Sequence, residues 1–305
     1  MSFSGDVRKE ISSAINNKEM RYVCLYGMLL MCRTITPEKL IFQSKSHTVS
    51  DTFAMLMDKV FKVSITPRET VSKTGKSLYT FDITDSGLIG NICTRYHIDP
   101  NDRKFDPETI ASHSLGTFLA GAFLASGSVN DPEKEYHLEF SAPNVSLADH
   151  ISAILGDIGA SAKTVVRRGQ YVVYIKGSEY IEDTLTFMGA RQCTLDLINV
   201  KIYKDVRNKA NRIANCDNAN IDKVVAAAIK QIEDIRLIAD RRGLDSLSPE
   251  LKEIAQLRLE NTGMSLQEIG ESLSTPISRS GVNHRFKKLK KIADEIREEA
   301  GVPEI

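Results

Sequence analysis

Residues 116–129 of this 305-residue chain read GTFLAGAFLASGSV, and residues 22–33 read YVCLYGMLLMCR. Each stretch is apolar, is long enough to form a buried helix, and carries a glycine near its middle, at Gly121 and Gly27. Two similar helices that begin about 94 residues apart indicate an internal duplication.

The segments that follow the two apolar helices share one order, which supports the duplication. In each copy a strand-like run is followed by an amphipathic helix, two runs that alternate between apolar and polar residues, and a short helix. In the first copy these segments are KLIFQS, TFAMLMDKVF, KVSITPR, SLYTFDI and residues 87–95. In the second copy they are EYHLEFS, LADHISAILGDIG, AKTVVRR, QYVVYIK and residues 179–187. The sequence therefore predicts the order αβαββα twice, with hairpin turns at residues 73–76 and 168–169.

The last 60 residues carry the clearest helix signals. Ser248 and Pro249 are a typical N-cap and first helical residue, and Ser265 with Glu268 forms a capping-box pattern. After a turn at residues 274–277, a final helix is predicted from Ser278, with an apolar stripe at Val282, Phe286, Leu289 and Ala293. Two short helices joined by a tight turn, with the small residue Gly270 at their crossing, predict a helix-turn-helix.

The final helix has the composition of a DNA-reading helix. Residues 278–291 contain six Lys or Arg and no acidic residue. Lysines can neutralise phosphates, while Ser, Asn and His near the start of such a helix can reach base edges in a major groove. The candidate DNA-binding residues are Ser265, Ser278, Arg279, Ser280, Asn283, His284, Arg285, Lys287, Lys288, Lys290 and Lys291.

Composition limits the remaining classes of function. The 40 basic and 40 acidic residues give a net charge of zero, so a nucleic-acid surface must be a local patch. No stretch has the length and apolarity of a membrane span or a signal peptide, and five Cys without a CxxC pair favour a reducing cytoplasm. Cys and His never fall at zinc spacing, and Gly75-Lys76-Ser77 precedes a strand rather than the helix of a P-loop. No cofactor and no metal are expected.

The predicted organisation has five parts. These are an N-terminal helix (1–19), a first repeat (20–105), a second repeat (106–190), a polar linker (191–220) and a helical domain (221–305) with its helix-turn-helix at about 265–292. In the linker, Lys204, Arg207, Lys209 and Arg212 could contact phosphates or could simply be solvated.

Residues 118–129 resemble the signature helix of LAGLIDADG homing endonucleases, and residues 22–33 resemble a degenerate first copy. The resemblance implies an α+β two-copy fold from about residue 20 to residue 187. In that family a carboxylate near the end of each helix binds the catalytic metal. The matching positions here hold Cys32 and Ser126, so the resemblance implies a retained fold with lost catalysis.

Two further resemblances concern the C-terminal part and the whole chain. IGESL…GVNHRFKKLKKI resembles the promoter-reading region of bacterial sigma factors, although its turn is about two residues longer and contains Pro276. Residues 128–140, 208–220, 225–233 and 278–289 carry a resemblance to the WhiA family across nearly the whole chain. This resemblance implies a DNA-binding regulator of cell division, chromosome segregation or sporulation in Gram-positive bacteria.

Several alternatives stay open at this point. The repeated domain could be a DNA saddle using Lys39, Lys45, Arg68, Arg167 and Lys176, or it could bind a protein or a ligand. A divergent nuclease using other carboxylates, such as Asp131, and a protein-interaction module are the competing functions. The favoured hypothesis is a sequence-specific transcription regulator that is not an enzyme. Its expected partner is double-stranded DNA, with a co-regulator or RNA polymerase as further candidates and no membrane, and its expected location is the nucleoid in the cytoplasm.

Overall fold

The computed structural model describes residues 2–299. The chain forms two compact units, Met1–Asp205 and Val206–Ile305. Within the described range, no helix combines the length and the hydropathy needed to cross a bilayer.

The first unit consists of helix α1 (Phe3–Ala14) and two copies of one arrangement. The elements of the first copy are α2 (Lys18–Leu30), β1 (Thr34–Thr36), β2 (Lys39–Ser44), α3 (His47–Phe61), β3 (Arg68–Val71), β4 (Ser77–Ile83) and α4 (Ser86–Arg95). After two short 3-10 turns, η1 (Pro107–Thr109) and η2 (Ser112–Ser114), the second copy contains α5 (Leu115–Ser126), β5 (Gly127–Val129), β6 (Leu138–Ala142), α6 (Val145–Asp157), β7 (Lys163–Arg167), β8 (Gln170–Ile175) and α7 (Ser178–Phe187). The antiparallel sheets have the equivalent orders β1-β2-β4-β3 and β5-β6-β8-β7, which confirms the duplication.

The copies differ from the predicted order in their strands. Each contains one additional strand, β1 or β5, directly after its apolar helix, and three residues are too few to show alternation. The run KVSITPR does not form the predicted strand. Lys62 has a φ of 60° and ends α3, and Pro67 has no N–H to donate to a ladder, so β3 begins at Arg68. Both predicted hairpin turns are present.

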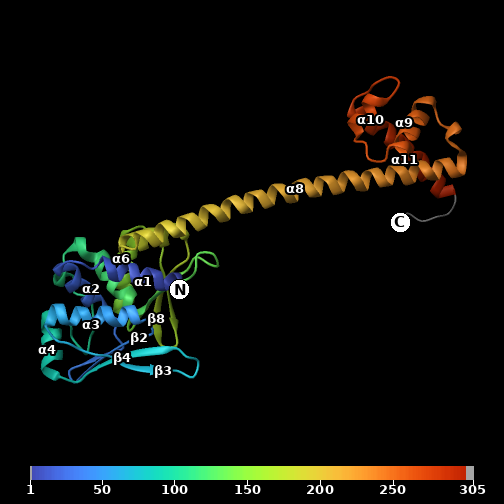
Figure 1. Cartoon of the computed structure of the whole chain (residues 1–305). Coiled ribbons are helices and arrows are strands. Elements are labelled where there is room, and N and C mark those ends of the chain that lie inside the picture. The colour runs from blue at the N-terminus through green and yellow to red at the C-terminus, as the bar shows by residue number, and fades with distance from the viewer. Residues whose placement is uncertain (1, 300–305) are drawn as a thin grey trace. The chain divides into compact units, whose positions relative to one another are not determined.

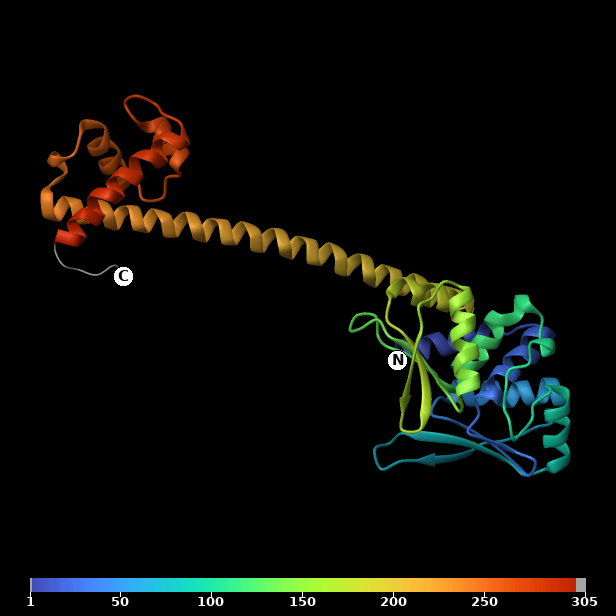
Figure 2. The same cartoon turned by 180° about the vertical axis from the view of Figure 1, so that it is seen from behind.

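The two apolar helices α2 and α5 pack against each other in the core of the first unit. A Cβ atom on Gly27 would lie 2.3 Å from the carbonyl oxygen of Phe118, and one on Gly121 would lie 2.1 Å from that of Cys24. The helix backbones are therefore in contact at both glycines. Helix α3 packs on the first sheet (Figure 1), and the reverse view shows α6 beside the second (Figure 2).

The stretch predicted as a polar linker, 191–220, is helical in the structure. Helix α8 (Arg191–Arg242) runs without interruption through that stretch and through the helix expected to start near Ile221. The run NCDNAN at 215–220 is rich in residues that are common in turns, but the 52 residues of α8 contain neither Pro nor Gly. Asn costs only about 0.7 kcal/mol or less relative to Ala in a helix, which is too little to end one.

The second unit has a hydrophobic core of its own. After α8 come η3 (Leu244–Ser246), α9 (Pro249–Glu260), α10 (Leu266–Ser272) and α11 (Arg279–Glu299). Figure 1 labels the three helices α9, α10 and α11. Ile235 and Ile238 from the C-terminal part of α8 are fully buried with Ile254, Ile269 and Val282. The starts of α9, α10 and α11 agree with the predicted caps within one residue.

Candidate nucleic-acid interface

Helices α10 and α11 form the helix-turn-helix, and its geometry is fixed by close backbone contacts. A Cβ atom on Gly270 would lie 2.4 Å from the carbonyl oxygen of Ile277, in the turn before α11. The amide of Ile277 donates to the carbonyl of Gly270 at 3.1 Å. At the start of α10, the Ser265 hydroxyl accepts from the amide of Glu268, whose carboxylate accepts from the amide of Ser265. The predicted capping box and the need for a small residue are both confirmed.

Helix α11 separates an apolar face from a polar and basic one. Val282, Phe286, Leu289 and Ala293 are buried, as predicted, and pack on the core of the unit. The opposite face is exposed to solvent. Up to Lys291 its members are Ser280, Asn283, His284, Lys287, Lys288, Lys290 and Lys291, and beyond Lys291 the same face carries Glu295 and Glu298. At about 100° per residue these side chains cover one continuous side of the helix, with hydrogen-bonding groups near the N-terminus and lysines beyond them.

The other candidate residues have different surroundings. Ser265 caps α10, and the Ser278 hydroxyl accepts from the amide of Gly281 at 3.3 Å. Both hydroxyls therefore hold the backbone at the start of a helix. Arg279 is exposed at the start of α11. Arg285 faces α9 instead of the exposed surface, because its side chain is only 16% exposed and pairs with Glu250 at 3.5 Å.

Two positioning residues on α9 carried no recognisable signal in the sequence. Glu253 accepts a hydrogen bond of 2.6 Å from the amide of Ser274, the first residue of the predicted turn. Arg258 is 2% exposed, donates to the carbonyl of Met264 at 2.6 Å, and lies 5.3 Å from the ring centre of Phe286. These contacts tie both loops that flank α10 to α9. Long-range contacts of this kind leave no local periodicity.

The Glu253 anchor predicts an acid-dependent stability. Its hydrogen bond from Ser274, and to a smaller extent the charge of Arg285, lowers the pKa of Glu253 from its ordinary value of 4.5. A carboxylate whose pKa is lower in the folded state stabilises the fold at pH values above its unfolded-state pKa. This stabilisation is lost as the pH falls through the folded-state pKa. We expect Glu253→Gln to lower the melting temperature of the second unit by roughly 2–5 °C at pH 7 and by much less at pH 3.

Calorimetry of the full chain measures this effect. All nine tyrosines lie before residue 206, so tyrosine fluorescence reports only the unfolding of the first unit. A calorimetric transition without a matching change in tyrosine fluorescence therefore belongs to the second unit. Glu260→Gln, at an exposed position on the same helix, is the control. Equal destabilisation by the two substitutions at pH 7 would contradict the anchoring role of Glu253.

The cations of the two sheets do not form a uniform basic surface. Lys39 pairs with Asp82 at 3.2 Å, Arg167 with Glu139 at 3.4 Å, and Lys176 with Glu135 at 4.0 Å. In α8, Lys204 donates to the carbonyl of Pro132 and lies 5.0 Å from the ring centre of Tyr136. These ion pairs engage three of the five cations of the predicted saddle, whereas residues 278–291 contain no acidic residue.

The positions that correspond to the nuclease carboxylates do not fit a metal. Burial raises the pKa of the Cys32 thiol to about 12, and the thiol donates to the carbonyl of Thr34. The Ser126 hydroxyl donates to the carbonyl of Ala122 at 3.2 Å. Neutral thiols and hydroxyls are poor ligands for Mg²⁺, which prefers charged oxygens. Among the side chains that the structure describes, no three of His, Cys, Asp or Glu are placed to hold an ion.

Fold and site together define a helix-turn-helix protein with a degenerate two-copy LAGLIDADG-like domain. Residues 115–207 match the family model described as the WhiA LAGLIDADG-like domain, and residues 210–293 match the WhiA C-terminal HTH domain. "Probable cell division protein WhiA" of Clostridium perfringens is 34% identical over 97% of this chain and 99% of that protein. The protein of that name from Ruminiclostridium cellulolyticum is 35% identical over 97% and 98%. The chain belongs to the WhiA family.

A solved structure supports the same fold. The crystal structure of full-length WhiA from Thermotoga maritima has a TM-score of 0.57 to this chain and 23% sequence identity. The match covers 97% of this chain and 99% of that one.

Proposed function

We propose that the protein is a sequence-specific DNA-binding transcription regulator without nuclease activity. The exposed side of α11 from Ser280 to Lys291 carries this proposal, because hydrogen-bonding side chains and lysines share one continuous surface there without an acid. Such a helix suits a major groove, with its first turns at base edges and its lysines at phosphates. The names of the curated relatives support a link to cell division, and chromosome segregation and sporulation belong to the same proposal.

Under this proposal the partner is double-stranded DNA, and the protein acts on the nucleoid in the cytoplasm. A co-regulator or RNA polymerase is a further partner, which the second unit would bring to the DNA site. Genome-wide DNA occupancy tests the proposal and supplies the target site. Occupancy that does not exceed the background at any locus would overturn it.

The proposal also predicts that DNA is bound but not cut. Cys32 and Ser126 replace the carboxylates that would bind metal, and the carboxylate of Asp131 accepts from the amide of Glu133 in a surface turn. We expect no nicking of plasmid or of the occupied duplex with Mg²⁺ or Mn²⁺. Gel analysis of the full chain against Asp131→Ala measures this. Cleavage that EDTA and Asp131→Ala both abolish would instead support the divergent nuclease.

A further inference from the structure

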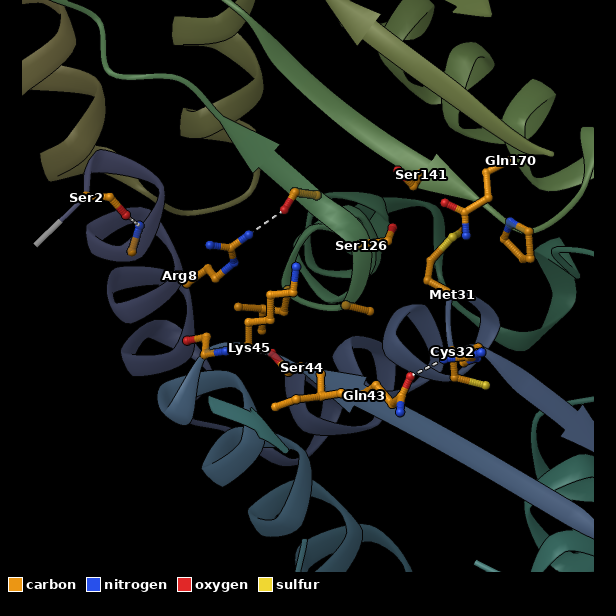
Figure 3. A pocket seen from close by; sticks show the side chains of 18 residues that line it. Ser2, Arg8, Met31, Cys32, Gln43, Ser44, Lys45, Ser126, Ser141 and Gln170 are labelled. Carbon is orange, nitrogen blue, oxygen red and sulfur yellow. Dashed lines mark hydrogen bonds between the residues drawn. The ribbon is translucent and has the colours of Figure 1, made fainter. Parts of the chain in front are cut away.

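A hollow of about 900 Å³ lies where α2 and α5 end, and Figure 3 shows it from close by. Its walls include Cys32 and Ser126, the two positions that would carry the carboxylates of a nuclease. Residues from both copies and from the start of α1 line it, so the hollow lies between the two repeats of the first unit.

The charge of this hollow is opposite to that of a metal site. Its lining residues include Arg8, Arg33 and Lys45, and no Asp or Glu. Within residues 2–299 none of the three cations forms an ion pair. Arg33 donates to the side-chain oxygen of Gln43 at 2.7 Å, and Lys45 is exposed to the hollow and to solvent. A divalent cation would be repelled here, whereas an anion would be attracted.

Arg8 is a half-buried cation that has no carboxylate partner among the residues that the structure describes. Its guanidinium donates to the carbonyl of Gly127 at 2.6 Å and to that of Ser4 at 3.4 Å, and it lies 5.7 Å from the ring centre of Phe123. Burial lowers the pKa of Arg8, and no carboxylate offsets that cost. A partly buried charge is destabilising unless it is paired. Arg8 therefore has capacity for a negatively charged ligand.

From these observations we propose that the hollow binds the phosphoryl group of a small phosphorylated molecule. Three cations line it, from α1, after the end of α2 and after the end of β2. The hydroxyl of Ser141 and the amide of Gln170 lie on the side of the second copy (Figure 3). A phosphoryl group carries up to two charges and three acceptor oxygens, which can use donors from several directions. A carboxylate has one charge and two oxygens.

The size of the hollow favours a free ligand over a DNA phosphate. Pockets for small molecules have volumes of about 300–1,000 Å³, and this one lies within that range. One wall of the hollow is formed by Ser2, Gly5 and Arg8 of the α1 region. A contact between an exposed surface and the backbone of a duplex would not need such a wall. The inference is independent of the DNA-reading role of α11, because every lining residue belongs to the first unit.

Calorimetric titration of the full chain with inorganic tripolyphosphate tests the proposal. We expect saturable binding that weakens as the salt concentration rises. Arg8→Gln should reduce the affinity about tenfold and Lys45→Ala about fivefold, because each removes a charge-assisted contact. Lys9→Ala is the control, since Lys9 is the exposed neighbour of Arg8 on α1 and does not line the hollow. Its affinity should change less than twofold.

Each other outcome overturns the proposal. No saturable binding, or equal affinity in the wild type, Arg8→Gln and Lys45→Ala, would exclude a phosphoryl site at this hollow. If the wild type binds an unrelated duplex through these two residues but does not bind tripolyphosphate, the hollow belongs to a DNA surface instead. Lys45→Ala keeps the test valid if Arg8→Gln unfolds, since Lys45 is exposed and forms no ion pair within residues 2–299.

Discussion

Replacing Gly121 with alanine should lower the free energy of unfolding of the first unit by about 3 kcal/mol, at the upper end of the cost of overpacking a core. The added Cβ would lie 2.1 Å from the carbonyl oxygen of Cys24, on the backbone of α2. No side-chain rotation can relieve a clash with backbone, so α2 and α5 must separate. Their separation would loosen the contacts of Tyr26, Phe118 and the rest of the buried core between the two copies.

A second glycine provides a matched control for this effect. Gly156 lies within α6, and a Cβ atom there would meet nothing within 4 Å. Because alanine is favoured over glycine in a helix by about 1 kcal/mol, Gly156→Ala should raise the stability slightly. The two substitutions add the same methyl group and are expected to have opposite signs.

Urea unfolding of the full chain, followed by tyrosine fluorescence, measures the first unit alone. All nine tyrosines lie before residue 206, and the chain contains no Trp. The midpoint should fall for Gly121→Ala and rise for Gly156→Ala at similar slopes. Similar midpoints for the two variants would mean that the helices are not in backbone contact at Gly121.

The same glycines show why so much of the fold could be predicted. Gly27 and Gly121 mark the two copies of the apolar helix in the sequence, and Gly270 marks the crossing of the helix-turn-helix, where a close contact excludes a larger residue. Ser265 and Glu268 mark the start of α10, since a capping box acts between neighbouring residues. Signals of this kind are local, and the sequence therefore displays them.

The features that could not be predicted depend on distant contacts or on weak local preferences. Helix α8 continues through its Asn-rich run because nothing there forbids a helix. Glu253 reaches Ser274, 21 residues further along the chain, and no periodicity connects them. The basic hollow is assembled from short pieces of both copies, and none of these pieces forms a motif. In the sequence, Cys32 and Ser126 mark only the positions of the replaced carboxylates, and nothing there predicts a hollow or its charge.

The prediction that bears most directly on function divides α11 into two roles. Asn283 is exposed within the first two turns, near Ser280 and His284, where a docked helix meets base edges. An amide can both donate and accept, so it can discriminate between bases. Asn283→Ala should therefore cost about 1–3 kcal/mol in binding to the occupied site, and little in binding to a scrambled duplex.

Lys291 should behave differently, because it is exposed two turns further along the helix, where phosphates are the expected partners. A lysine is a mobile point charge that suits phosphate better than bidentate reading of a base. Lys291→Ala should weaken binding to the specific and scrambled duplexes alike, and should lower the slope of log affinity against log salt concentration by about one. Affinities for both duplexes across a salt series measure the two variants together. Equal losses on both duplexes for Asn283→Ala would show that α11 does not read bases in this orientation, because a contact that discriminates bases must depend on the sequence it meets.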